Sequence, residues 1–428
     1  MDSVEDDAHR APEPPREMLL PRRMWGAVWM GSLLVAFGVG PSLFFGDSNL
    51  LLVLKLTIVP WGAFALAEYF SESSGTPRAL DPRVSSRFVK ILLGLSSILA
   101  TLGFAILFIS DFGSVSEVVS GYQYSSVYTV ARMLASLSPF ALVLAIYAHY
   151  FGILGRRSVT LIAAVLLGAN FAASLNAGYL GGVAIPGITF LLFATMVGFM
   201  RWRLVALILV SLWLILPWLF TLRNNIREGI GLGRSSLLSA PFERFRIDNQ
   251  ISLLDVAVPS NMVDVPEVGL YFRTALIPRL LDPERPILDI GQSMNLAVGN
   301  LNLNNLSFGH YGTVYWLLGF AGVVSVAAVL GGLFGLGVRN FDRLWAVAVL
   351  GAVGAPAVWP EMAFPNYFAG FVQFWLICFA AILGAYLIDE TTTRSSEVAR
   401  QPSIKKSQRR SGGPQGLERN ASSASDAW

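Results

Sequence analysis

Residues 89–110 read VKILLGLSSILATLGFAILFIS, an apolar run whose one charged residue, Lys90, lies at its start. About twenty apolar residues cross a lipid bilayer as an α-helix. The run is continuous and does not alternate, so it predicts a spanning helix rather than a strand of a membrane barrel. Runs of the same character recur along the chain. The predicted spans are roughly Trp25–Phe45, Asn49–Tyr69, Val89–Ser110, Val127–Leu154, Ser158–Asn176, Val183–Met200, Leu204–Leu222, Tyr311–Gly335, Leu344–Trp359 and Tyr367–Ile388.

The composition agrees with a chain that lies largely in lipid. Of its 428 residues 54% are hydrophobic and only 14% are charged, and the mean hydropathy is +0.57. Soluble domains carry about 25% charged residues, which argues against a cytosolic enzyme, a disordered scaffold and a nucleic-acid binder. The pI of 9.0 does not favour nucleic acid, because the positive charges form short clusters between apolar blocks. The predicted fold class is all-α: a polytopic integral membrane bundle of about ten transmembrane helices with one large external loop.

The positions of lysine and arginine predict the orientation of the spans. Basic residues concentrate in short cytoplasmic loops of membrane proteins. Arg22 and Arg23 precede the first run, and further clusters follow every second run, at Arg78 to Lys90, Arg156 and Arg157, Arg201 and Arg203, Arg339 and Arg343, and Arg394 to Arg410. The short loops between these clusters contain no lysine or arginine. The pattern predicts both termini in the cytoplasm, as in a multi-pass protein of the bacterial cytoplasmic (inner) membrane. The first run is too long for a removed signal peptide and lacks a small-residue cleavage site.

The spans divide the chain into five parts. The predicted parts are a disordered cytoplasmic N-tail (1–20), transmembrane helices one to seven (21–222), a large external loop (223–309), helices eight to ten (310–389) and a disordered cytoplasmic C-tail (390–428). The external loop holds eight arginines and nine acidic residues and is nearly neutral. Connections this long between packed elements are usually functional, so we expect the loop to contribute to the active site.

Two cations inside predicted spans are candidate ligand-binding residues. Lys55 and Arg132 lie one and a half to two turns below the external ends of their spans, roughly 8–9 Å deep by helical rise. Charges within a bilayer are costly and usually functional, and no carboxylate lies in the outer half of any span to pair with them. The pair predicts an anionic ligand such as a lipid phosphate or pyrophosphate. The alternative is snorkelling of both side chains to headgroups or water. Glu68, at the predicted cytoplasmic end of its helix, is assigned no special role.

The external loop supplies further candidates. Guanidinium groups bind phosphate in a bidentate way, which makes five loop arginines candidate pyrophosphate ligands. They are Arg223 and Arg227, which share a face if the seventh helix continues outward, together with Arg273, Arg279 and Arg285. Ion pairs with the loop acids are the alternative for each arginine. Glu267 and His310 are the candidate catalytic bases, with Asp264 and Glu361 as rival carboxylates and an interfacial aromatic role as the alternative for His310.

Metal and cofactor chemistry is not expected. The single cysteine, Cys378, excludes an internal disulfide framework and a multi-thiolate metal site. His9, His149 and His310 lie far apart in the sequence, which argues against zinc or haem. No phosphate-binding loop of an ATP-driven pump and no hydrolase or zinc-protease motif is present. The sequence therefore predicts no cofactor and no metal.

A short motif in the loop resembles one family. Gly269-Leu-Tyr271 is followed by Ile277-Pro278-Arg279 and then by Asp282-Pro-Glu-Arg285-Pro286. This pattern, late in a large external loop, resembles Wzy-type bacterial polysaccharide polymerases, that is, O-antigen or oligosaccharide repeat unit polymerases, and the related O-antigen ligases. The resemblance covers the general topology and about forty residues in detail. Asp282 stands where the family usually has Trp, and Arg285 where it usually has Lys.

The resemblance implies a metal-independent membrane glycosyltransferase. Its donor would be a glycan chain on undecaprenyl pyrophosphate, and its acceptor a new repeat unit on the same lipid. The implied reaction occurs outside the cytoplasm and releases undecaprenyl pyrophosphate. A chain-length regulator and a flippase are the implied protein partners, besides membrane lipid and the glycans; no nucleic acid is expected.

Two other functions remain open at this stage. A ligase that moves the finished glycan to another acceptor would use the same cations. A glycolipid flippase or transporter would instead show internal repeats and paired broken helices. The sequence shows no two halves of equal length, and the long loop interrupts any symmetry. A structural scaffold would need no buried cations.

Overall fold

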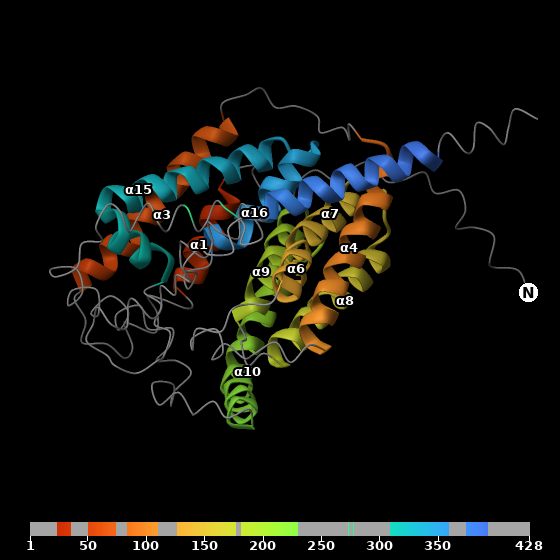
Figure 1. Ribbon diagram of the computed structural model, residues 1–428. Coiled ribbons are helices and arrows are strands. Elements are labelled where there is room, and N and C mark those ends of the chain that lie inside the picture. Colours follow the sequence, from red (N-terminus) through yellow and green to blue (C-terminus); the bar gives the residue numbers. More distant parts are fainter. Residues whose placement is uncertain are drawn as a thin grey trace, which may run out of the picture.

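The computed structural model describes residues 24–35, 50–73, 84–109, 126–176, 181–229, 273, 277, 309–358 and 374–392. These residues form helices joined by short turns and include no strand (Figure 1). The helices are α1 (Trp25–Leu34), α3 (Leu50–Ser73), α4 (Ser86–Ile109), α6 (Ser126–Ala135), α7 (Ser138–Tyr150), α8 (Arg156–Asn176), α9 (Gly181–Met196), α10 (Trp202–Gly229), α15 (Gly309–Arg339), α16 (Leu344–Val358) and a last helix, Phe374–Thr392.

Each predicted span contains a helix, and five helical stretches are long and apolar enough to cross a membrane. Those five are Ser86–Ile109, Val127–Tyr150, Arg156–Asn176, Tyr311–Arg339 and Phe374–Thr392. Shorter apolar helices occupy Trp25–Leu34, Val183–Met196, Trp202–Leu212 and Leu344–Gly354. The all-helical class is therefore confirmed for the described residues, and the five apolar helices are consistent with the membrane character expected from the composition.

Several helix ends differ from the predicted boundaries. α10 continues to Gly229, seven residues into the predicted loop, and the last helix continues to Thr392, into the predicted C-tail. The predicted fourth span is divided into α6 and α7 by a turn. Pro139 follows that turn, and its missing N–H prevents a continuous helical ladder. α15 is interrupted at Gly319, whose φ of 66° and ψ of −170° lie in a region that only glycine adopts readily.

Contacts between helix ends show which ends share a face of the bundle. The Tyr147 hydroxyl donates to the Asp342 carbonyl (3.3 Å), which joins the end of α7 to the turn after α15. The Arg156 guanidinium donates to the Phe199 carbonyl (3.0 Å), which joins the start of α8 to the turn after α9. His149, near the end of α7, packs edge-on against Phe199 with ring centroids 5.0 Å apart. These ends therefore lie together at one face.

Contacts of other described helices show that successive helix ends alternate between this face and the opposite one. Asn176 at the end of α8 donates to the Phe108 carbonyl near the end of α4 (2.9 Å), so these two ends meet at the opposite face. Arg87 at the start of α4 forms an ion pair with Asp389 near the end of the last helix (3.3 Å). We call the first face the basic face, because the basic side chains at its helix ends are Arg87, Lys90, Arg156, Arg157, Arg201, Arg203, Arg339 and Arg343.

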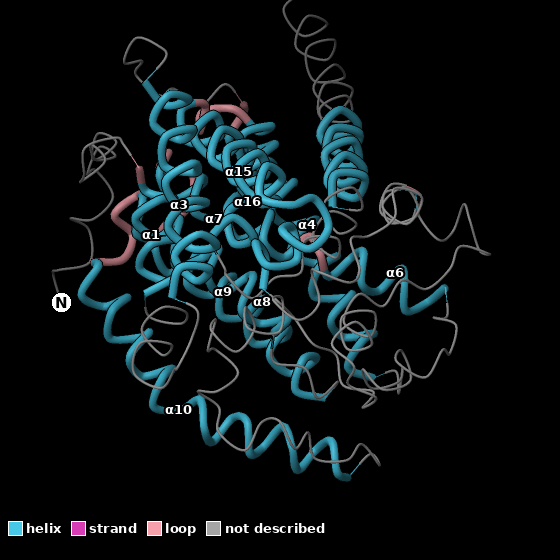
Figure 2. Tube along the Cα trace, turned by 90° about the vertical axis from the view of Figure 1, so that its left-hand side faces the viewer, coloured by secondary structure: helices cyan, strands magenta, loops and turns pink. Residues whose placement is uncertain are grey.

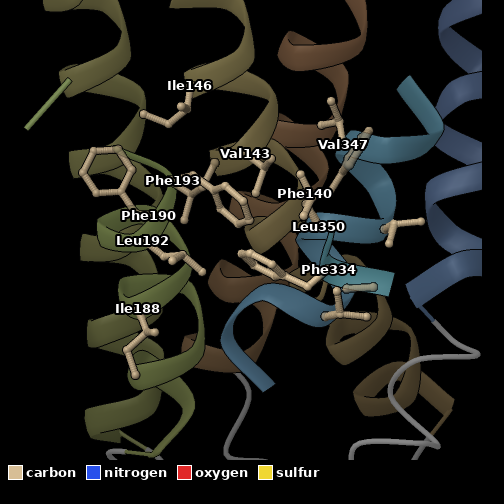
Figure 3. Packing of buried hydrophobic residues seen from close by; sticks show 14 of the residues in the cluster. Phe140, Val143, Ile146, Ile188, Phe190, Leu192, Phe193, Phe334, Val347 and Leu350 are labelled. Carbon is tan, nitrogen blue, oxygen red and sulfur yellow. The ribbon is translucent and has the colours of Figure 1, made fainter. Parts of the chain in front are cut away.

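The core lies where α7, α9, α15 and α16 meet (Figure 3). Every residue of α7 from Ser138 to Ala148 is fully buried, so this helix is central. Phe193 of α9 and Phe334 of α15 stack with ring centroids 6.1 Å apart. Around this centre, helices with exposed Leu, Ile, Val and Phe side chains present an apolar outer surface, as expected for a protein whose solvent there is lipid.

α3 and α15 form the closest helix pair, and both figures show them side by side (Figures 1 and 2). Glycine makes this approach possible. A Cβ added to Gly331 would lie 2.2 Å from the Phe64 carbonyl oxygen, and one added to Gly335 would lie 2.7 Å from the Glu68 carbonyl oxygen. The spacing of these two glycines is the small-xxx-small pattern that lets helix backbones approach in membranes. Since Phe64 pairs with Gly331 and Glu68 with Gly335, the two helices run parallel.

Candidate functional site

Lys55 and Arg132 both lie away from the basic face. Lys55 is exposed in the second turn of α3, and Arg132 is exposed on α6. They are the two described side chains that the sequence proposes as ligands of an anion within the bilayer. Both helices begin at the face opposite the basic face, so these charges are separated from the basic clusters by most of the length of the bundle.

The structure places these two cations on different helix pairs. α3 packs mainly against α15 and α1, whereas α6 packs mainly against α4. Both views show α3 and α6 apart from each other (Figures 1 and 2). Lys55 and Arg132 therefore correspond to two separate positive positions around the rim and not to one two-cation pocket.

Arg132 has an aromatic neighbour one turn earlier on its own helix. Its guanidinium lies 5.7 Å from the centroid of the Tyr128 ring and donates to the Tyr128 hydroxyl at 3.4 Å. The two residues share a face of α6 because they are four positions apart. A contact with an aromatic ring leaves the positive charge of the guanidinium in place, so this pairing is compatible with the predicted ligand role.

The loop arginines are described in part. The backbone at Arg223 and Arg227 is helical, because α10 extends to Gly229. The condition set by the sequence, that the seventh helix continues beyond residue 222, is met, and the two residues lie one turn apart. Arg273 is exposed, and its carbonyl accepts the backbone N–H of Ile277 (3.0 Å), a single helical turn within the predicted motif region. The Arg279 and Arg285 predictions lie outside the described residues.

The two candidate bases have no described side chain. The backbone of His310 is the second residue of α15, so it stands at the helix start that faces away from the basic face. Glu267 lies outside the described residues, as do the rival carboxylates Asp264 and Glu361. The choice of base therefore stays a prediction from the sequence.

Glu68 is a residue whose role the sequence reasoning missed. Its side chain is fully buried, and its two carboxylate oxygens accept the backbone N–H groups of Gly26 (2.7 Å) and Ala27 (2.8 Å). These N–H groups belong to the first turn of α1, which has no partner for them within the helix. Trp61 on the same side of α3 donates its indole N–H to the Ala27 carbonyl (2.8 Å).

The assignment of no special role to Glu68 is therefore wrong. A carboxylate near the positive end of a helix is stabilised both by the N–H groups and by the helix dipole. The residue fixes the start of α1 to α3 at the basic face. Two features of the sequence could have identified this role of Glu68. One is a carboxylate that follows an apolar run, and the other is the start of α1, which has no Ser, Thr, Asp or Asn as its cap.

Within the described part of the chain, no group of three or more His, Cys, Asp and Glu side chains is arranged to hold a metal ion. Cys378 is buried in the last helix. The described residues suited to bind a ligand are the cations named above, and their chemistry suits an anionic group.

Comparison with known proteins gave no further assignment: no family model, no curated protein and no solved structure matches the chain.

Proposed function

We propose that the protein is a membrane glycosyltransferase that joins undecaprenyl-pyrophosphate-linked oligosaccharide repeat units into a surface polysaccharide. The observation that carries the proposal is the Ile277-Pro278-Arg279 motif, followed by Asp282-Pro-Glu-Arg-Pro286, in the long segment between α10 and α15. The arrangement of the helices supports it, because α10 begins and α15 ends at the basic face. By the positive-inside rule the intervening segment then belongs on the external side.

The cations give the reaction its electrostatic rationale. The acceptor hydroxyl attacks the anomeric carbon of the donor sugar, the bond from that carbon to the pyrophosphate oxygen breaks, and undecaprenyl pyrophosphate leaves. Negative charge develops on the departing diphosphate. Lys55 is exposed in the second turn of α3 and Arg132 in the last turn of α6, and either one would supply preorganised positive charge that stabilises such a leaving group. Glu267 or His310 takes the proton of the acceptor hydroxyl.

The number of spans and the two-substrate arrangement belong to the same proposal. Ten spans place both chain ends in the cytoplasm, and the separate positions of Lys55 and Arg132 suit two lipid-linked substrates better than one. Arg223 and Arg227, one turn apart on the outward extension of α10, would hold a diphosphate near the start of the external segment.

The experiment compares surface glycan from cells that carry variants of the protein. We expect Lys55→Ala and Arg279→Ala to yield single repeat units in place of long chains, because the leaving group loses its stabilising charge. Lys90→Ala is the matched control, since Lys90 is also an exposed lysine near the start of a helix but lies at the basic face. Membrane abundance of all three variants is measured by immunoblotting.

The outcomes separate the proposal from its rivals. Normal chain lengths in both Lys55→Ala and Arg279→Ala would contradict the site, and an equal loss in Lys90→Ala would show a general effect of charge removal. Long chains that accumulate on lipid in a deletion strain would instead identify a ligase.

A flippase is the second candidate, because one described feature favours it. α15 is broken at Gly319, and transporters commonly use interrupted helices near the middle of the bilayer. Repeat units that accumulate on the cytoplasmic leaflet of a deletion strain would support the flippase and contradict the polymerase.

A further inference from the structure

Two neighbouring turns at the basic face are built alike. α7 ends at Tyr150 and is followed by Gly152 with a φ of 69°; α9 ends at Met196 and is followed by Gly198 with a φ of 73°. In each turn a later backbone N–H returns to a carbonyl of the preceding helix, from Ile153 to Ala148 (2.8 Å) and from Met200 to Ala194 (2.9 Å). Glycine in the left-handed region stops a helix in this way.

Each turn leads directly into a pair of arginines at the start of the next helix. Arg156 and Arg157 begin α8, and Arg201 and Arg203 flank Trp202 at the start of α10. The two turns touch, because the Arg156 guanidinium lies 5.2 Å from the centroid of the Phe199 ring and donates to the Phe199 carbonyl. The two segments joined by this contact carry four positive charges, Arg156 and Arg157 on one and Arg201 and Arg203 on the other.

The four arginines are used differently. All four side chains are exposed; Arg156 joins the two turns, whereas Arg157, Arg201 and Arg203 take no part in that contact. No hydrogen bond or ion pair joins these three side chains to another residue in the part of the chain that the structure describes. Like charges on neighbouring turns repel one another, so binding of an anion to these arginines lowers the electrostatic free energy.

The surroundings indicate which class of anion suits this cluster. Trp202 is 41% exposed beside the two arginines and packs edge-on against the buried Trp29 with ring centroids 5.3 Å apart. Below it, Leu204 and Leu207 are exposed on α10. Tryptophan next to aliphatic side chains on the outside of a membrane helix marks the level of the lipid headgroups. These neighbours are suited to an anion that carries both a phosphodiester group and acyl chains.

We infer that Arg157, Arg201 and Arg203, with Trp202 between the last two, form a binding site for the headgroup of an anionic phospholipid of the adjoining leaflet. The arginines bind the phosphate oxygens, and the acyl chains lie along the exposed aliphatic side chains of α10. This site is independent of the proposed glycosyltransferase reaction, because it lies at the basic face and involves none of the residues assigned to the reaction.

The test uses the purified full-length protein in detergent, with bound lipid counted by native mass spectrometry. Cardiolipin, phosphatidylglycerol, phosphatidylcholine and inorganic phosphate are titrated separately. We expect cardiolipin and phosphatidylglycerol to bind and phosphatidylcholine not to bind. Each arginine removed weakens binding about fivefold, so Arg201→Gln with Arg203→Gln weakens it about twenty-five-fold.

Two variant pairs make the result decisive. Lys90→Gln with Arg339→Gln removes the same charge from the same face and leaves binding unchanged if the site is local. Arg201→Lys with Arg203→Lys keeps the charge and retains most of the binding, which separates charge loss from misfolding. Equal weakening in the Lys90 and Arg339 pair, binding of phosphatidylcholine as tight as that of cardiolipin, or displacement of the lipid by millimolar inorganic phosphate would each overturn the inference.

Discussion

At the scale of single residues, Glu68 and Lys55 show how one helix places two charges in opposite environments. Lys55 lies on the outward side of α3 and is exposed, whereas Glu68 faces α1 and α15 and is fully buried. A buried carboxylate is tolerated only when its oxygens are hydrogen-bonded, and the first turn of α1 supplies the donors. The sequence could locate both charges along the helix, but it could not tell which side of α3 meets a neighbour.

We expect Glu68→Gln to destabilise the protein by about 1–3 kcal/mol, because an amide offers only one acceptor oxygen to the two N–H groups of Gly26 and Ala27. Thermal unfolding in detergent measures the effect. Glu68→Asp should also destabilise, since the shorter side chain keeps its charge but loses reach. Unchanged stability of Glu68→Gln would contradict the capping role.

At the scale of helices, the contact between α3 and α15 shows what the pattern of the sequence left undetermined. Gly331 and Gly335 form a small-xxx-small pair that can be read from the sequence, but their partner cannot, because α3 lies more than two hundred residues earlier. The spacing of residues shows which face of a helix is packed, but it does not show which other helix packs against that face. The interruptions of the helices at Pro139 and Gly319 could not be predicted from hydropathy, because both residues lie within continuous apolar runs.

Substitutions of neighbouring glycines test this helix contact. Gly331→Ala should destabilise by about 1–3 kcal/mol or more, since its Cβ would lie 2.2 Å from the Phe64 carbonyl oxygen and a backbone cannot move aside cheaply. Gly332→Ala is the matched control, because its Cβ would meet only the Ser71 hydroxyl at 3.6 Å. The stability of both variants is measured by thermal unfolding in detergent and by the amount of protein expressed. Equal stability of the two variants would show that the helices are less closely packed than described.

At the scale of the whole molecule, two independent observations give the same alternation of helix ends. Arginine and lysine positions predicted it from the sequence, and contacts such as Tyr147 with Asp342 and Asn176 with Phe108 reproduce it from packing. The fold class was predictable because a bilayer allows few architectures. The candidate site was not predictable to the same degree, because it depends on a long polar segment with no periodic pattern, and arginines there suit both ligands and ion pairs.

The orientation of this bundle can be tested by cysteine labelling in intact cells. Cys378→Ser removes the single natural cysteine, which is buried. In that background we expect a membrane-impermeant maleimide to label Val127→Cys and Asn176→Cys, which lie at helix ends away from the basic face. Ser86→Cys and Ser158→Cys, exposed at the starts of α4 and α8, should react only after the cells are opened, since the positive-inside rule assigns the basic face to the cytoplasm.

The reverse pattern, with Ser86→Cys and Ser158→Cys labelled from outside, would show that the bundle has the opposite orientation in the membrane. The segment between α10 and α15 would then face the cytoplasm, where lipid-linked repeat units are not polymerised in the proposed reaction, and the proposal would fail. Labelling at both faces in sealed cells would instead contradict the alternation itself. The lipid site on α8 and α10 would survive an inverted orientation, because it requires only that the basic face meets an anionic leaflet.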